Sequence, residues 1–287
     1  MIHPYTEELV SIESEDGLPL EGAVIRPASA VTRPLALVWV HGLASKFYGR
    51  TTIPLGHSLA DHGYTFVTGN NRGHDFGTVY VRKNGERLLA GGGWELFSDC
   101  PLDIGSWVSF AIARGFRGVA LIGHSLGALK VAYYQSQRQD PRVVGLVAAS
   151  PPARNRQPDP ALSALAEQMV SDGRGRDLLP WDISPAGGGT WSARAYHNRV
   201  RTNTDVYGTF TPDPAVASVT CPILALYGSD EAWVGSEADL QTIVQNARLA
   251  PRVETRMIPG ADHSYTGHEA EVAACIAAWA DTLSPPE

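Results

Sequence analysis

The segment Gly118-Val119-Ala120-Leu121-Ile122-Gly123-His124-Ser125-Leu126-Gly127 decides the fold of this chain of 287 residues. An apolar run, residues 118–122, precedes the pattern Gly-x-Ser-x-Gly, and a helix-like segment, Ala128 to Gln137, follows it. The order strand, sharp turn, helix is the context in which this pattern lifts a serine hydroxyl clear of a sheet. The glycines fit that role because strand and helix can approach so closely only where side chains are absent. The same letters also occur in ordinary βα turns, so the rest of the chain must supply partners for Ser125.

Composition and charge bound the possible functions. Hydrophobic residues make up 44% of the chain, which is ample for a full core, and the formal net charge is −7. That charge argues against a nucleic-acid partner, and the sequence offers no basic run for a membrane surface. Cys100, Cys221 and Cys275 are scattered, so neither a disulfide framework nor a metal cluster is indicated. The acidic first 30 residues lack the apolar core of a signal peptide. We therefore expect a soluble, cytoplasmic protein.

Strand-like and helix-like segments alternate along the chain. The dipeptide Asp16-Gly17, between Leu9–Ile12 and Leu20–Ile25, predicts an antiparallel hairpin. Continuous apolar runs predict buried strands over residues 35–40, 118–122, 143–149 and 223–227, and residues 64–68 and 253–258 are interpreted as further strands. Helical spacing predicts helices over residues 54–62, 102–113, 128–137, 236–246 and 269–283. The pattern predicts an α/β fold: a mostly parallel, doubly wound sheet with helices on both faces and an N-terminal antiparallel hairpin.

Residues 152–215 break this alternation. They are rich in proline and glycine, including Gly187-Gly188-Gly189, with helix-like pieces at residues 161–170 and 192–200. The sheet pattern resumes directly afterwards, so the segment is interpreted as an insertion. We predict a core of residues 1–151 and 216–287, and a lid or cap insertion of residues 152–215.

The residues that end successive predicted strands carry reactive side chains. In open parallel sheets, chemistry gathers at the carboxyl ends of the strands. There the sequence places His41-Gly42-Leu43, Ser125, Asp230 with Glu231, and His263. A serine, then an acid, then a histidine is the chain order of the catalytic residues of α/β-hydrolases and differs from the orders in the two common serine protease folds.

From about residue 7 to residue 283 the chain resembles the α/β-hydrolase fold superfamily. The motifs that carry the resemblance are His41-Gly42, Gly123 to Gly127, Gly228-Ser229-Asp230 and Asp262-His263. The resemblance implies an α/β-hydrolase-type sheet, with the insertion at the place where the superfamily carries its lid. Asn71 to Asp75 and Gly228 to Glu231 also resemble a narrower subgroup that includes fungal siderophore esterases.

Catalytic roles follow from the chemistry of the residues. A serine hydroxyl needs an adjacent base near neutral pH, so Ser125 is the predicted nucleophile and His263 the predicted base. Asp230 is the predicted acid that orients the histidine. Glu231 remains an alternative, because many relatives place the acid three residues after the glycine and Asp230 lies only two after Gly228. His268 is the alternative to His263.

The oxyanion hole and the substrate pocket are assigned from position. The backbone N–H groups of Leu43 and Leu126 are the predicted donors to the oxyanion. Trp94, Trp191 and Tyr196 lie in irregular segments that could cover the serine, and they are the predicted substrate-binding residues. Trp181 lies in the same region. Aromatics there could equally form the lid's own small core.

The sequence therefore predicts a serine hydrolase that cleaves a carboxylic ester of a small molecule through an acyl-enzyme intermediate. No metal or organic cofactor is expected, since His74 with Asp75 lacks a third ligand. The protein is expected to be a monomer or homodimer without a nucleic-acid or membrane partner. A lactonase, thioesterase, acyltransferase or perhydrolase would use the same residues. A non-catalytic ligand receptor on this fold is the alternative of another class, and an intact triad argues against it.

Overall fold

A computed structural model describes residues 5–28, 33–154, 157–180 and 191–285. Within these ranges the centre of the fold is an eight-stranded sheet of order β1-β2-β4-β3-β7-β8-β9-β10. Its strands are β1 (Tyr5–Glu13), β2 (Pro19–Pro27), β3 (Leu35–Val40), β4 (Thr65–Gly69), β7 (Gly118–His124), β8 (Val143–Ala149), β9 (Ile223–Gly228) and β10 (Val253–Ile258). Strand β2 runs antiparallel to β1 and β4, and the remaining neighbours are parallel. The predicted mostly parallel sheet with an N-terminal antiparallel hairpin is confirmed.

The central strand β3 shows why the predicted strands read as unbroken apolar runs. All six of its residues are buried. Leu35, Leu37 and Trp39 pack into the core on one face of the sheet. The alternate residues Ala36, Val38 and Val40 pack into the core on the other face. Because successive side chains of a strand point to opposite faces, a strand covered on both sides must be apolar at every position.

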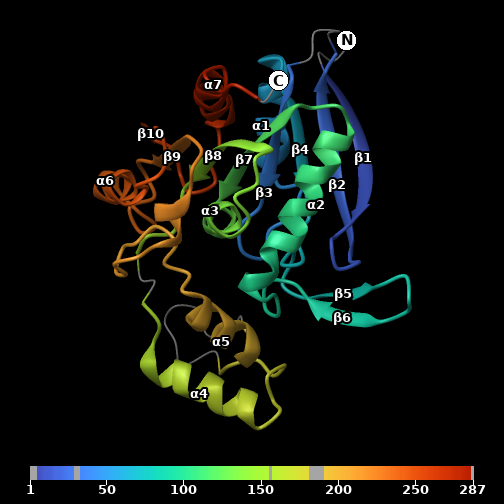
Figure 1. The fold of residues 1–287 in the computed structure, drawn as a ribbon, viewed down its shortest axis with the longest axis vertical. Helices are drawn as coiled ribbons and strands as arrows, with labels where there is room; N and C mark the ends of the chain where they lie inside the picture. The colour runs from blue at the N-terminus through green and yellow to red at the C-terminus, as the bar shows by residue number, and fades with distance from the viewer. Residues whose placement is uncertain (1–4, 29–32, 155–156, 181–190, 286–287) are drawn as a thin grey trace.

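Helices cover both faces of the sheet (Figure 1). Helices α1 (Thr52–Asp61) and α7 (Glu269–Ala280) pack together over one face of the sheet. The other face is covered by α2 (Cys100–Ala113), α3 (Leu126–Arg138) and α6 (Glu237–Asn246). A short 3-10 helix, η1 (Phe97–Asp99), leads into α2. This arrangement brings the carboxyl ends of β3, β7, β9 and β10 to one edge, where the predicted site residues lie.

A second, two-stranded sheet was not predicted. Strands β5 (Thr78–Val81) and β6 (Arg87–Ala90) form an antiparallel hairpin around Asn84-Gly85. The sequence pattern predicts no strand between residues 68 and 102. The apolar side chains of Val79 and Val81 are about half exposed. The hairpin therefore lacks the buried apolar run that identified the other strands.

The described part of the insertion contains α4 (Pro160–Ser171) and α5 (Ala193–Thr202), which lie at one end of the molecule (Figure 1). The two helices enclose a small apolar core of their own. A 3-10 helix, η3 (Ala215–Ser218), then leads into β9. Trp181 and Gly187 to Gly189 lie outside the described residues.

A buried ion-pair cluster joins the insertion to the core. Glu95 accepts from the Lys130 ammonium of α3 at 2.6 Å and from the Arg199 guanidinium of α5 at 3.4 Å. All three side chains are at most 5% exposed. Since charges are buried only when they are paired, this cluster fixes α5 against the helix that follows Ser125.

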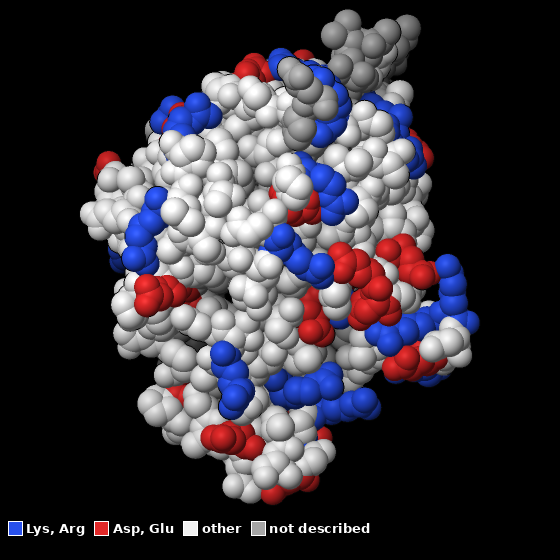
Figure 2. Space-filling model, in the orientation of Figure 1, with Lys and Arg blue, Asp and Glu red and all other residues white. Residues whose placement is uncertain are grey.

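Basic and acidic side chains are interspersed on the face of the molecule shown in Figure 2, with larger neutral areas between them. That face carries no extended field of one sign. Among the described residues, no helix combines the length and the apolar character that crossing a bilayer requires.

Candidate active site

Ser125 lies on a strained turn between β7 and α3. Its φ of 54° falls in the left-handed region, which a non-glycine residue adopts only when its surroundings impose it. A Cβ added at Gly123 would lie 2.2 Å from the carbonyl oxygen of Gly127. A Cβ added at Gly127 would lie 2.0 Å from the carbonyl oxygen of Val40. Neither position has room for a side chain, so the two glycines make this turn possible.

His263 follows β10 and faces Ser125. Its Nε2 lies 3.1 Å from the Oγ of Ser125, and its Nδ1 lies 2.7 Å from the Oε2 of Glu231. When Nδ1–H donates to the carboxylate, Nε2 carries the lone pair that can accept the serine proton. The structure thus places a hydroxyl, an imidazole and a carboxylate in one hydrogen-bonded line.

Both oxygens of the Glu231 carboxylate are occupied. Oε2 accepts from His263, while Oε1 accepts from the Ser150 hydroxyl at 2.6 Å and from the Gly228 N–H at 2.5 Å. Ser150 also contacts the Tyr265 hydroxyl at 2.6 Å. The Glu231 side chain is fully buried. A buried carboxylate with this many hydrogen bonds is held in one orientation, and so is the imidazole that it contacts.

Asp230, the predicted acid, lies outside this line, and the prediction is corrected to Glu231. The Asp230 side chain is exposed and accepts from the Ser229 hydroxyl at 3.0 Å. The physical reason is the turn after β9. Glu231 folds back onto the Gly228 N–H, three residues before it, and this turn directs Glu231 inward and Asp230 toward solvent.

The segment His41-Gly42-Leu43 lies against the nucleophile. A Cβ added at Gly42 would be 3.0 Å from the Cβ of Ser125. Within the described structure, the N–H groups of Leu43 and Leu126 have no hydrogen-bond acceptor. Leu126 is the first residue of α3, where backbone N–H groups are left unpaired by the helix itself. Two unpaired donors therefore flank Ser125.

His41 holds this segment in place as a neutral ring. Its Nδ1–H donates to the Gly42 carbonyl at 2.8 Å, and its Nε2 accepts from the Asn71 N–H at 2.9 Å. Burial lowers the pKa of His41 to about 4. The ring is thus uncharged near neutral pH, which matches one donating and one accepting nitrogen.

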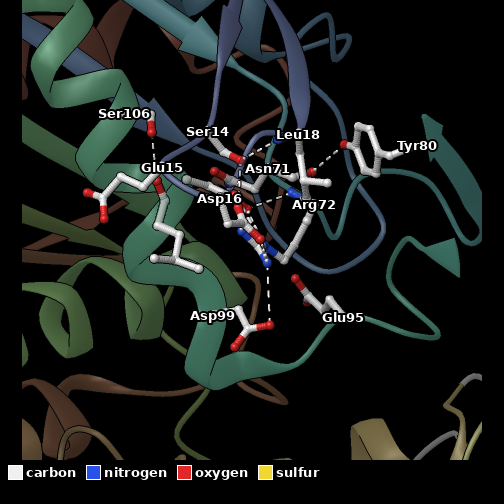
Figure 3. Close-up of polar contacts among 12 residues, drawn as sticks. Ser14, Glu15, Asp16, Leu18, Asn71, Arg72, Tyr80, Glu95, Asp99 and Ser106 are labelled. Carbon is white, nitrogen blue, oxygen red and sulfur yellow. Dashed lines mark hydrogen bonds and ion pairs between the residues drawn. The ribbon is translucent and has the colours of Figure 1, made fainter. Parts of the chain in front are cut away.

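Arg72 fixes the loop that supplies the Asn71 N–H (Figure 3). This buried arginine forms ion pairs with three carboxylates, those of Asp16, Asp99 and Asp103, at 2.8, 3.3 and 2.8 Å. The Asp103 carboxylate also accepts from the Arg72 N–H at 2.8 Å. Figure 3 shows Tyr80 directed at Asn71, whose carbonyl accepts from the tyrosine hydroxyl. The hairpin turn β1–β2 and helix α2 thereby position the loop behind His41.

Comparison with protein families settles which family this chain represents. Residues 37–275 match the family model described as the alpha/beta hydrolase family. The chain belongs to the alpha/beta hydrolase family. No curated protein matches the sequence. The family assignment confirms the predicted α/β-hydrolase fold, and the narrower resemblance to siderophore esterases stays a prediction.

Several solved structures have a similar fold. Est1E from Butyrivibrio proteoclasticus, with ferulic acid bound, is 19% identical, with 94% of this chain and 97% of that chain covered and a TM-score of 0.65. The Pyrococcus furiosus esterase Pf2001 is 17% identical, with 97% and 93% covered and a TM-score of 0.62. The alpha/beta hydrolase GrgF from Penicillium sp. sh18 is 14% identical, with 96% and 97% covered and a TM-score of 0.68. At these identities the likeness is one of fold.

In this alpha/beta hydrolase the predicted substrate-binding aromatics contact other parts of the protein. The Trp94 Nε1–H donates to the Arg176 carbonyl at 2.8 Å. Trp191 packs on Tyr196, with ring centroids 5.7 Å apart, in the insertion's own core. The Tyr196 hydroxyl accepts from the Asp159 N–H. These contacts account for the aromatic character of the insertion, and contact with a substrate stays a prediction.

Two other histidines form hydrogen bonds with neighbouring carboxylates. His268 pairs with Glu271 at the start of α7, and His74 pairs with Asp75. In the part of the chain that the structure describes, no group of three or more His, Cys, Asp or Glu side chains could hold a metal ion.

One feature of this site, Trp233, was not predicted from the sequence. Trp233 is 68% exposed, and its ring centroid lies 5.1 Å from that of His263. Its position two residues after Glu231 was the available signal. His124 donates from Nε2–H to the His263 carbonyl at 2.6 Å and stacks on Trp39, with an interplanar angle of 12°. Burial lowers the pKa of His124 to about 4, so it acts as a neutral brace for the loop that carries His263.

Proposed function

We propose that this chain is a serine hydrolase that cleaves carboxylic esters of small molecules through an acyl-enzyme intermediate. The observation that carries the proposal is the line of hydrogen bonds from Ser125 through His263 to Glu231, at 3.1 and 2.7 Å. Structures of the same fold are named as esterases from Pyrococcus furiosus and Rhodothermus marinus, which is consistent with the proposal.

Acylation begins with attack by Ser125 on the ester carbonyl. A bond forms between Oγ and the carbonyl carbon as the hydroxyl proton passes to Nε2 of His263. The carbonyl oxygen becomes an oxyanion, which the N–H groups of Leu43 and Leu126 stabilise. Such donors are each worth about 3–4 kcal/mol in the transition state. Collapse of the intermediate breaks the bond to the alcohol oxygen, which takes the proton from His263 and leaves.

Deacylation repeats these steps with water. His263 accepts a proton from water as its oxygen bonds to the acyl carbon, and it returns the proton to Oγ as the acid is released. Glu231 stabilises the imidazolium that forms in each half of the cycle, because its buried carboxylate lies against Nδ1.

Access to Ser125 is the proposed task of the insertion. Helices α4 and α5 form a separate small core that is fixed to the main body through Glu95, Lys130 and Arg199. In this proposal residues 152–215 act as the lid. The exposed ring of Trp233 contributes an apolar surface directly beside His263.

The replacement Ser125→Ala tests the chemistry. The variant should lose turnover of p-nitrophenyl acetate and butyrate and labelling by a fluorophosphonate probe. Ser136→Ala is the matched control, because Ser136 lies on the same helix and, among the described residues, its side chain bonds only to the Tyr133 carbonyl and the Gln137 amide. The proposal is wrong if the wild-type protein shows neither reaction, or if Ser125→Ala retains both.

A further inference from the structure

A cavity of about 370 Å³ lies beside the nucleophile, between the start of α1 and the segment that follows His263. Gly42 and His124 line the cavity and adjoin Ser125, Gly42 in space and His124 along the chain. The apolar part of its lining comes from Trp39 and Leu55. Its volume falls in the range of cavities that bind small molecules, about 300–1,000 Å³. The catalytic steps described above use none of its polar side chains.

The end of the cavity at α1 carries positive charge without a counter-charge. Helix α1 has no acidic residue in its first turn, and its N-cap Thr51 makes no capping hydrogen bond. The N–H groups of Thr51 and Thr52 have no acceptor in the described part of the protein. Arg50, which also lines the cavity, forms no ion pair within the described residues. An unpaired guanidinium beside an uncapped helix N-terminus favours an anion.

Thr52 provides a second, independent observation. It lines the cavity and is only 5% exposed. Its hydroxyl has no hydrogen-bond partner among the described residues. The hydroxyl oxygen is not fully enclosed by the described protein, so a ligand or water in the cavity can bond to it. The hydroxyl therefore marks a place where a polar ligand group is expected.

The opposite wall limits where an anion can sit. Glu269 lines the cavity from the first turn of α7. Its carboxylate already complements the N-terminus of its own helix, whereas α1 has no such group. Repulsion from Glu269 would hold a ligand anion at the α1 end, close to Arg50 and Thr52.

We propose that this cavity binds a carboxylate carried by the substrate itself, so that the preferred substrates are esters with a second, anionic group. Arg50, the Thr52 hydroxyl and the free N–H groups of α1 bind the carboxylate, while Ser125 attacks the ester. Ser125 does not itself line the cavity, but Gly42 and His124 do and both adjoin Ser125, so the substrate of this proposal spans from the nucleophile past these two residues into the cavity. This inference rests on the proposed ester hydrolysis.

Paired esters test the inference and show which side of the ester carries the anion. Mono(4-nitrophenyl) adipate, with the acid on the acyl chain, is compared with its methyl ester. 4-(Butyryloxy)benzoate, with the acid on the leaving group, is likewise compared with its methyl ester. Each kcat/KM is divided by the rate constant for alkaline hydrolysis of the same compound, which removes differences in intrinsic reactivity.

The wild-type protein should prefer the anionic member of at least one pair by about 10-fold or more, as expected for a charge-assisted contact. Arg50→Gln should remove most of that preference, and Thr52→Val should reduce it. Arg87→Gln is the matched control: it removes the same charge from the exposed hairpin strand β6 and should keep the preference. Equal treatment of both members by the wild type, or an unchanged preference in Arg50→Gln, would overturn the inference.

Binding measurements separate this inference from the proposed function. Ser125→Ala is titrated calorimetrically with each intact anionic ester and with inorganic phosphate. Arg50-dependent binding of an anionic ester without any wild-type turnover would support the anion site and contradict ester hydrolysis. Turnover of all four esters without preference for the anionic members would support ester hydrolysis and contradict the anion site. Phosphate binding as tight as ester binding would overturn the assignment of the site to the substrate's own carboxylate.

Discussion

At the scale of single residues, the most informative contrast is between Asp230 and Glu231. Both are carboxylates at the end of β9, yet one is exposed and the other fully buried. The difference comes from the turn closed by the Gly228 N–H, which directs the later residue toward His263. Function at this position depends on the direction of a side chain, because either carboxylate could stabilise an imidazolium.

Replacing each of these carboxylic acids by its amide should show which of the two supports catalysis. Glu231→Gln is expected to lower kcat roughly 1,000-fold or more, because the amide cannot stabilise the imidazolium and can favour the wrong tautomer. Asp230→Asn is the matched control and should stay within about 2-fold of wild type, since its exposed side chain contributes little. Steady-state kinetics on p-nitrophenyl butyrate provides the measurement. The opposite ranking would return the role of the acid to Asp230.

Trp233 should act on substrate affinity. A partly exposed ring next to His263 can bury apolar substrate surface, and aromatic contacts are worth about 0.5–1.5 kcal/mol. Trp233→Ala is therefore expected to raise KM about 2- to 10-fold with little change in kcat, and Trp233→Phe should restore most of the loss. A fall in kcat at constant KM would contradict a binding role.

The sequence predicted Ser125 because it follows β7, a strand that is buried on both faces and therefore recognisable. His263 follows β10, a half-buried strand at the edge of the sheet, and was predicted from its place in the chain order. The acid was not predictable to the residue, since two neighbouring carboxylates differ only in the turn that the backbone takes. Arg50, Thr52 and Trp233 belong to no sequence motif that would have identified them. Their proposed roles follow from which loops meet in space, and spacing along the chain does not show that.

At the scale of elements, the cluster of Glu95, Lys130 and Arg199 connects the insertion to the helix that starts at the nucleophile. Two cations share one carboxylate away from water. Removal of one partner from a buried ion pair leaves a buried charge without a counter-charge. The free energy lost in this way is larger than the free energy by which the intact pair stabilises the fold.

Glu95→Gln should therefore lower the free energy of unfolding by about 3–5 kcal/mol. Glu86→Gln breaks the exposed pair with Arg82 on the hairpin and should cost less than about 1 kcal/mol. Urea denaturation gives both values. Limited proteolysis should also show earlier cleavage around α5 in Glu95→Gln. Equal stabilities of the two variants would contradict a structural role for the cluster.

The elements themselves were predictable to different degrees for a physical reason. Strand β8 and strand β10 were placed at their observed bounds, because each is bounded by turn residues and packed in the sheet. Hairpin β5–β6 was not predicted, because its half-exposed valines alternate with polar residues and do not form an apolar run. Its Asn84-Gly85 turn was the signal that could have identified it.

At the scale of the whole molecule, buried neutral histidines make stability depend on pH. Burial lowers the pKa of His41 and of His124 to about 4, against about 6.5 in an unfolded chain. Between these values the unfolded chain binds protons that the folded protein does not. Stability from these groups is therefore complete above about pH 6.5 and is lost as the pH falls toward 4.

His124→Gln should flatten this dependence by about one proton between pH 6.5 and pH 4.5, because glutamine does not titrate. His62→Gln, at the exposed end of α1, is the control and should keep the wild-type slope. Urea denaturation at several pH values provides the slopes. An unchanged slope in His124→Gln would show that its protonation is not linked to folding.

The anchoring of Glu231 has a consequence for how such a protein can change over evolution. The described hydrogen bonds of Ser125, Glu231 and His263 go to core residues, and none reaches the described part of the insertion. If the insertion were exchanged for another, the loss of Arg199 would still leave Glu95 and Lys130 as a neutral pair. The proposed catalytic residues are thus held in place independently of the described insertion. If residues 152–215 act as the proposed lid, replacing them would change the range of substrates while the hydrogen bonds of these three residues stay intact.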